Sequence, residues 1–323
     1  MNTLSQPVLD ALISGAAVSS SGPAGWVRIT GNDRVRWLNG MVTNSVQALA
    51  PGEGIYAFLL NAQGRIQGDG IIWGDTDELL LQTAATQATT LIEMLDRFII
   101  MDEVELADAS TTLHGVRLAG PQAASILQSL SIAAPETVDR WSTASWMGHD
   151  VRVQSMHAPL VPRFELWVAS EQTAQELVNT LLSHGATQAS DADFEALRIL
   201  EGTPLFGADI RDRDLPQETG QMRALHFNKG CYLGQEIVER IRSRGNVHRT
   251  FHAFELSGTT PEAGTPLEAE GKSVGELTSL AQINGRNLAL GFIRREALER
   301  RLPIVYAGGT AQPIESPVRF ATS

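Results

Sequence analysis

Apolar residues in the first two thirds of the chain recur at two spacings, one typical of strands and one typical of helices. Short apolar or alternating runs predict strands over residues 25–30, 55–60, 66–73, 78–82, 104–106, 114–118 and 164–168. Apolar residues three and four positions apart predict helices over residues 86–98, 121–130, 171–182 and 192–200. A further short helix is expected after Asp33, whose side chain could cap it. The recurrence of strand–helix sets predicts an α+β fold made of two halves.

The pattern changes near Gly245. Short strands are predicted over residues 251–256, 273–278 and 288–293, and Gly and Pro residues separate them. Short strands with regular turns are typical of a small all-β barrel. We therefore expect the two α+β halves within residues 1–245 and a C-terminal β-barrel domain within residues 246–323.

Composition narrows the possible classes of protein. Of the 323 residues, 43% are hydrophobic and 19% are charged, which suffices for sizeable buried cores. No apolar run approaches the roughly 20 residues of a membrane span, and the first 21 residues do not resemble a signal peptide. A single cysteine cannot form an internal disulfide, which fits a reducing compartment. We expect a cytoplasmic protein with no membrane partner.

The net charge of −12 argues against direct binding of nucleic acid, because attraction to phosphates is largely electrostatic. One stretch, residues 229–249, is nevertheless basic. It contains five cations, Lys229, Arg240, Arg242, Arg244 and Arg249, and two acids, Glu236 and Glu239. Two interpretations stay open: an anion-binding site, or a solvated helix face with paired charges.

Candidate chemistry centres on the only cysteine, Cys231. The flanking Gly230 and Gly234 let the backbone bend and approach a ligand closely. Residues 235–244 predict a helix that ends at Gly245, so Cys231 precedes a helix N-terminus. The positive helix end and the nearby Lys229 would both favour a thiolate.

Cys231 and Lys229 are therefore the catalytic candidates. The alternative is that Cys231 is simply a small buried hydrophobic residue. One cysteine cannot hold zinc or an iron–sulfur cluster, which need three or four ligands, so no metal site is expected.

The octapeptide formed by residues 229–236, Lys-Gly-Cys-Tyr-Leu-Gly-Gln-Glu, resembles the signature of the YgfZ family, bacterial relatives of mitochondrial proteins that assist iron–sulfur cluster maturation. The segment before the octapeptide also resembles that family, with Gly-Thr-Pro at 202–204 and Leu-Pro-Gln-Glu at 215–218. Near the N-terminus, Thr-Gly-Asn-Asp-Arg at 30–34 and Trp-Leu-Asn-Gly at 37–40 resemble the wider aminomethyltransferase superfamily. The resemblance spans roughly residues 30–294.

This resemblance implies a clover-leaf of two ferredoxin-like α+β halves and a C-terminal β-barrel around a central channel that binds tetrahydrofolate or a one-carbon derivative. It also implies iron–sulfur cluster proteins as partners, including cluster-dependent enzymes that modify tRNA. Cys231 and Lys229 match the family's functional motif. The residues that the resemblance makes candidates for folate binding are Asp69, Arg198, Tyr232, Gln235, Glu236 and Arg242.

Two departures distinguish the chain from aminomethyltransferases. Those enzymes carry two adjacent aspartates after an Asn-x-x-Gly-Gly turn, whereas this chain has Gly68 before Asp69. Their Arg-x-Glu-x-Gly pattern becomes Arg-Ile-Leu-Glu-Gly at residues 198–202, which puts Leu200 where a folate-facing Glu is expected. Asp69 could thus be a structural relic, and we expect no glycine-cleavage turnover.

The leading hypothesis is a folate-binding accessory protein for iron–sulfur enzymes. An aminomethyltransferase of glycine cleavage and a tRNA-contacting protein are the alternatives. The sequence does not select the client protein, the one-carbon form of folate or the chemical role of Cys231.

Overall fold

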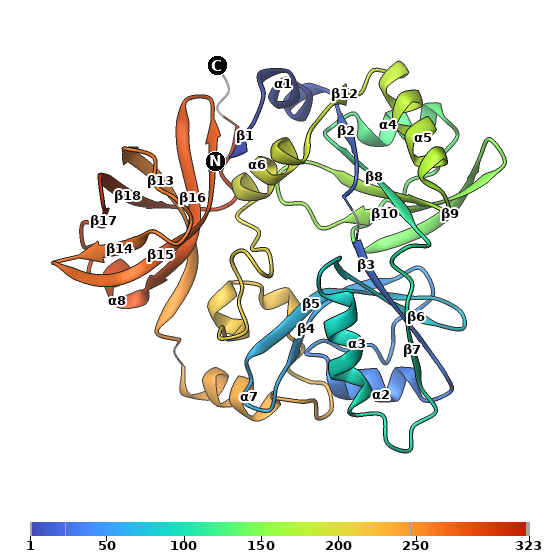
Figure 1. Cartoon of the computed structure of the whole chain (residues 1–323), viewed down its shortest axis with the longest axis horizontal. Helices are drawn as coiled ribbons and strands as arrows, with labels where there is room; N and C mark the ends of the chain where they lie inside the picture. Colours follow the sequence, from blue (N-terminus) through green and yellow to red (C-terminus); the bar gives the residue numbers. More distant parts are fainter. Residues whose placement is uncertain (1, 23, 246, 321–323) are drawn as a thin grey trace.

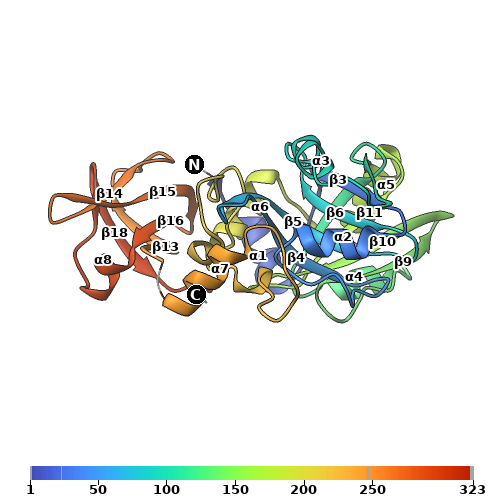
Figure 2. The same ribbon diagram turned by 90° about the horizontal axis from the view of Figure 1, so that it is seen from below.

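The computed structural model describes residues 2–22, 24–245 and 247–320, and the Arg244 side chain lies outside that description. Figure 1 shows three sheet-based units arranged around the middle of the molecule. Seen from below, the barrel forms one end and the two α+β halves form the other (Figure 2). Among the described helices, none is long and apolar enough to cross a membrane.

The first half is a five-stranded antiparallel sheet with the order β4-β5-β6-β3-β7. Its strands are β3 (Ala24–Thr30), β4 (Gly54–Leu60), β5 (Ile66–Gly74), β6 (Leu79–Ala84) and β7 (Glu105–Asp108). Its helices are α2 (Arg34–Met41) and α3 (Ala88–Asp96). Asp33 precedes α2 but does not cap it, because its carboxylate accepts the backbone N–H of Glu103 at 2.9 Å. The expected cap at Asp33 was therefore wrong.

The second half is a six-stranded sheet with the order β12-β2-β8-β11-β10-β9. Its strands are β2 (Ala17–Ser20), β8 (His114–Ala119), β9 (Arg140–Trp146), β10 (His149–Met156), β11 (Arg163–Val168) and β12 (Thr187–Gln188). Its helices are α4 (Ala123–Ser129) and α5 (Glu171–Ser183). Each half thus combines one sheet with its own helices, which confirms the α+β prediction for residues preceding the barrel.

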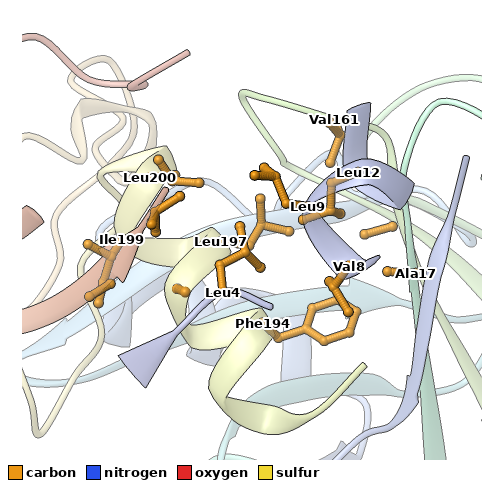
Figure 3. Packing of buried hydrophobic residues seen from close by; sticks show 14 of the residues in the cluster. Leu4, Val8, Leu9, Leu12, Ala17, Val161, Phe194, Leu197, Ile199 and Leu200 are labelled. Atoms are coloured by element: carbon orange, nitrogen blue, oxygen red, sulfur yellow. The ribbon is translucent and has the colours of Figure 1, made fainter. Parts of the chain in front are cut away.

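Helices α1 (Gln6–Ser14) and α6 (Asp191–Glu201) connect the second half to the barrel. Figure 3 shows Val8, Leu9 and Leu12 of α1 gathered with Phe194 and Leu197 of α6. Other apolar residues of this cluster come from barrel strands, so one continuous core holds both units. Burial of large apolar side chains here is the main source of stability at this junction.

The C-terminal unit is a closed barrel. Its strands are β13 (Arg249–Gly258), β14 (Pro266–Ala269), β15 (Lys272–Ile283), β16 (Arg286–Arg294), β17 (Val305–Tyr306) and β18 (Gly309–Ile314), with the short helix α8 (Arg295–Glu299) between β16 and β17. They follow the order β15-β14-β17-β18-β13-β16, and antiparallel pairing of β16 with β15 closes the ring. The barrel prediction is confirmed. The N-terminal strand β1 (Asn2–Thr3) adds to the outside of β15 in parallel.

The segment between α6 and the barrel contains the short 3-10 helices η1 (Pro216–Thr219) and η2 (Met222–Ala224), followed by α7 (Gln235–Arg244). Both Gly234 before α7 and Gly245 after it have positive φ, a conformation that glycine adopts readily. This segment folds back beside β4 and β5, as Figure 1 shows for α7.

Candidate functional site

A cavity of about 720 Å³ lies where the units meet. Its wall comes from β5 and β6 of the first half, β8 and β11 of the second half, α6, the segment 203–205 and Asn2 of β1. Its charged lining residues are Asp69, Arg117, Arg163, Glu165, Asp191, Glu195 and Arg198. A mixed polar and aromatic cavity of this size is typical of a site for a small organic molecule.

Asp69 is the carboxylate that β5 presents to the cavity. The hydroxyl of Tyr56 donates a hydrogen bond to Asp69 Oδ2 at 2.6 Å. Burial raises the pKa of Asp69 to about 6, and the Tyr56 hydroxyl and the Arg223 guanidinium act in the opposite direction. A carboxyl group with this pKa can take up or release a proton near neutral pH.

Gly68, next to it, faces the other side of the sheet. A Cβ atom at this position would approach Leu91 Cδ2 of α3 to 2.7 Å. Successive side chains of a strand point to opposite faces, so a second aspartate at position 68 would point at the helix layer and not into the cavity. Asp69 therefore still supplies a carboxylate to the cavity. The glycine at position 68 by itself does not argue against folate chemistry. The absence of glycine-cleavage turnover stays a prediction.

Helix α6 lines the cavity with one face. Asp191, Glu195 and Arg198 are spaced four and three residues apart and all contribute to the wall. Leu200, the residue at the position expected for a folate-facing Glu, is 2% exposed and lies in the hydrophobic core instead. Glu195 supplies a carboxylate from the same helix. The charged residues at helical spacing in a mostly apolar sequence could have indicated this face.

Arg198 has no hydrogen-bond donor left for a ligand. Its donors bind both carboxylate oxygens of Glu195 at 2.8 and 2.5 Å, Asp209 Oδ2 at 2.6 Å, the Thr203 carbonyl at 2.5 Å and the Ser279 hydroxyl at 2.8 Å. A guanidinium has five N–H donors, so all are used. Arg198 lines the cavity as expected, but it holds Glu195 in place and ties α6 to the barrel.

Two residues of the second sheet were not predicted as site residues. Glu165 of β11 lies directly opposite Arg117 of β8 in the antiparallel register, and both line the cavity. The Gln82 amide of the first sheet donates to Glu165 Oε2 at 2.7 Å, which links the two halves across the cavity. A charged residue inside a short apolar strand was the available signal, in Val-Arg-Leu at 116–118 and Phe-Glu-Leu at 164–166.

The octapeptide, residues 229–236, contributes no residue to the cavity wall. Lys229 Nζ donates to the backbone carbonyls of Asn39, Val42 and Asn44 at 2.6, 2.8 and 2.6 Å. Burial lowers the pKa of Lys229 to about 8, and the three carbonyl oxygens stabilise the charged form that dominates at neutral pH. Its three donors are committed to α2 and the following residues, and a role of its charge beside Cys231 stays a prediction.

Cys231 is exposed, which excludes the alternative of a small buried hydrophobic residue. Cys231 lies on the octapeptide loop and not in the cavity wall.

The remaining candidates also lie on this loop and on α7. Tyr232 is 7% exposed, and burial, with a smaller contribution from Glu239, raises its pKa to about 12. Gln235 Oε1 accepts the Tyr232 backbone N–H at 3.2 Å, which stabilises the turn into α7. Glu236 is exposed. Arg242 stacks on the ring of Phe227 at 4.4 Å and pairs with Glu239 at 3.5 Å. The structure thus separates these four residues, Tyr232, Gln235, Glu236 and Arg242, from the cavity.

A short polar connection joins the octapeptide to the cavity. Asn44, whose carbonyl binds Lys229, donates through Nδ2 to the carbonyls of Tyr56 at 2.9 Å and Arg223 at 3.0 Å. The Arg223 guanidinium lies over the Tyr56 ring at 4.3 Å, and Tyr56 binds Asp69. The octapeptide and Asp69 are therefore parts of one bonded assembly.

Among the described side chains of the basic stretch, Arg242 and Arg249 form ion pairs. Arg249 pairs with Asp214 at 2.5 Å and with Glu218 at 3.1 Å, and Lys229 and Arg242 are engaged as described above. The Arg244 side chain lies outside the described part of the chain. The described residues hold no cluster of His, Cys, Asp and Glu that could bind a metal ion.

Comparison with known proteins agrees with this architecture. Residues 10–229 match the GCVT N-terminal domain family, and residues 249–317 match the CAF17 C-terminal beta-barrel domain. The chain belongs to the GCVT family. The chain thus combines a GCVT domain with a C-terminal barrel of the family named for CAF17.

Several GCVT relatives cover most of the chain. A chloroplastic protein of Arabidopsis thaliana, provisionally named a transferase, is 27% identical over 296 residues, which are 90% of this chain and 68% of the relative. The tRNA-modifying protein YgfZ of Yersinia pseudotuberculosis is 28% identical over 269 residues, 80% of this chain and 78% of the relative. The resemblance to YgfZ inferred from the octapeptide is confirmed.

The fold is that of aminomethyltransferases. The glycine cleavage aminomethyltransferase T of Bartonella henselae superposes with a TM-score of 0.82 at 19% identity, covering 98% of this chain and 91% of that structure. At this identity the match supports the GCVT fold alone. The predicted fold, mixed α and β units with a closed C-terminal barrel, is confirmed.

Proposed function

We propose that this GCVT-family protein binds tetrahydrofolate, or a one-carbon derivative of it, and supports the assembly or repair of iron–sulfur cluster enzymes, including those that modify tRNA. The observation that carries the proposal is the cavity at the junction of the units, with Asp69, Glu165 and Glu195 on its wall. The protein would act in the cytoplasm, as the single cysteine suggests.

The cavity suits the chemistry of a reduced folate. A pterin ring carries several N–H donors, and carboxylates are strong acceptors for them. Trp167 and Phe194 belong to the same wall and give it an apolar part. A volume of about 720 Å³ accommodates much of such a ligand.

The accessory role rests on the octapeptide and on the relatives. Lys229 anchors the loop through three hydrogen bonds, and the loop presents the Cys231 thiol to solvent. An exposed thiol on an anchored loop is accessible to a partner protein. The relative named tRNA-modifying protein YgfZ supports a connection to tRNA-modifying enzymes.

Two measurements test the two parts of the proposal separately. Calorimetry with tetrahydrofolate and its 5-formyl derivative should give a saturable binding heat, and no heat at millimolar ligand contradicts the folate part. A Cys231→Ala variant should fold and bind folate normally but fail to sustain the activity of iron–sulfur enzymes in cells. Full support by that variant contradicts a role for the thiol.

An aminomethyltransferase of glycine cleavage is the second candidate, and the position of Asp69 in the cavity favours it. A carboxyl group with a pKa of about 6 can handle a proton at a substrate amine. Release of ammonia and methylene-folate from the aminomethylated carrier protein, above a control without enzyme, would establish it. The tRNA-contacting alternative has less support, because the net charge is −12 and Arg242 and Arg249 of the basic stretch are paired.

A further inference from the structure

The arginines of the cavity differ in how fully their donors are used. Arg198 uses all five. Arg163 donates through Nη2 to the His157 carbonyl at 3.1 Å and lies 3.3 Å from the buried Glu201 through Nη1. Arg117 retains a buried Nε without a hydrogen-bond partner. An unpaired buried charged donor is unfavourable, so Arg117 is the cavity arginine with the most to gain from a ligand.

A ligand can displace one of the present hydrogen-bond partners of Arg117. Its Nη2 binds the Ser19 hydroxyl at 3.1 Å, the Ser20 carbonyl at 3.4 Å and the exposed carboxylate of Asp191. The Asp191 side chain is 79% exposed, and ion pairs with such exposed partners contribute little. A ligand carboxylate can therefore replace Asp191 at small cost, because Asp191 regains water as its partner.

Two further features favour an anionic ligand group at this position. The Arg117 guanidinium lies over the Phe194 ring at 4.5 Å, which fixes its plane. Glu165 lies opposite on the neighbouring strand, but among the described residues it forms no ion pair with Arg117, and its Oε2 accepts from Gln82 instead. The guanidinium is thus oriented and remains available for a planar carboxylate.

We propose that Arg117 binds the carboxylate of the glutamate tail of a folate, in the place that Asp191 occupies, while the pterin ring lies toward Asp69. The proposal rests on the folate-binding function proposed above. Asp69 belongs to the first sheet and Arg117 to the second, so the two residues contact the cavity from different walls. An N–H-rich ring matches the carboxylate at one wall, and an anionic tail matches the arginine at the other.

The test compares two ligands that differ only in the tail, 5-formyltetrahydrofolate and 5-formyltetrahydropteroate, which lacks the glutamate. Arg117→Gln should weaken binding of the first by about 10- to 100-fold, the usual range for a lost charged hydrogen bond, and binding of the second by less than twofold. Asp191→Asn should strengthen binding of the first ligand only, by a few-fold, because it removes the internal competitor. Asp69→Asn should weaken both ligands to the same extent.

The outcomes separate this inference from the function on which it rests. If neither ligand binds the unaltered protein, the folate proposal fails and this inference fails with it. If both ligands bind the unaltered protein but Arg117→Gln affects them equally, only the tail site is refuted. Should Arg117→Gln not fold, the Asp191→Asn measurement decides, because that exposed substitution leaves Arg117 intact; equal affinity changes for the two ligands refute the tail site.

Discussion

At the residue scale, the face of β5 on which a side chain lies decides its chemistry. Asp69 points into the cavity and Gly68 points at α3. Two adjacent aspartates in a strand therefore cannot both serve one cavity. A chain with glycine at position 68 and aspartate at position 69 therefore retains the carboxylate that faces the cavity.

The raised pKa of Asp69 predicts a specific pH dependence of stability. Its value in the folded protein is about 6, above the ordinary 3.8, so folding favours the neutral carboxyl group. That contribution is fully present below pH 3.8 and is lost as the pH rises through 6. In urea unfolding, Asp69→Asn should gain stability relative to the unaltered protein between pH 4 and 7, by about 1–3 kcal/mol. A constant difference across this range would contradict the raised pKa.

Some of the residues that line the cavity were predicted from the sequence, and others were not. The resemblance pointed to Asp69 and Arg198, and both line the cavity. Arg117, Glu165 and Glu195 were missed, because each comes from a different strand or helix and only the packing of the units shows that they meet. The anchoring contacts of Lys229 were missed for a related reason: two residues of separation from Cys231 do not determine where a long side chain points.

At the scale of elements, prediction was accurate where local signals were strong. Helix α7 covers residues 235–244 as predicted, since two glycines with positive φ delimit it. Strands β4 to β6 were found from their apolar runs. The elements that were missed include helix α1 and strands β2, β9, β10, β14, β17 and β18. β9 is an edge strand with few apolar residues, and it exists because it pairs with β10; β17 has two residues, too few for a periodicity.

Substitution of two glycines of the octapeptide, Gly230 and Gly234, tests the conformation of its loop. Gly234 has φ +81°, and a Cβ there would lie 2.6 Å from the Asn61 carbonyl oxygen, whereas a Cβ at Gly230 would have no heavy atom within 4 Å. Gly234→Ala should therefore lower the free energy of unfolding by about 2–4 kcal/mol, from backbone strain and the clash. Gly230→Ala should stay within about 0.5 kcal/mol. Chemical denaturation of both variants measures this, and equal effects would refute the described loop.

At the scale of the whole molecule, one buried polar network holds the barrel against α6. Asp209, with a fully buried side chain, accepts from Arg198, from the Leu205 backbone N–H and from the hydroxyls of Thr278 and Ser279 on β15. These contacts join α6 and the segment that follows it to β15, whose Thr278 and Ser279 lie 69 and 70 residues after Asp209. The spacing of apolar residues along the sequence cannot predict such a network. Each of its members, taken alone, is an ordinary polar residue.

Removal of one partner should expose how much this network matters. Asp209→Asn keeps the shape but leaves the buried Arg198 with less compensation and adds an amide donor among groups that already donate. We expect a loss of about 3–5 kcal/mol in the free energy of unfolding, as for other broken buried pairs. Asp212→Asn, an exposed aspartate of the same segment, is the control and should change little. A small effect of Asp209→Asn would mean that the apolar core alone secures the barrel.

The pairing of β1 with β15 has a consequence for how the protein is made. Asn2 and Thr3 pair with Ala281 and Gln282, and Asn2 also lines the cavity. During synthesis, Asn2 must therefore wait for β15 to emerge before it takes its place in the cavity wall. Because this contact joins segments far apart in sequence, completion of the wall is expected late in folding.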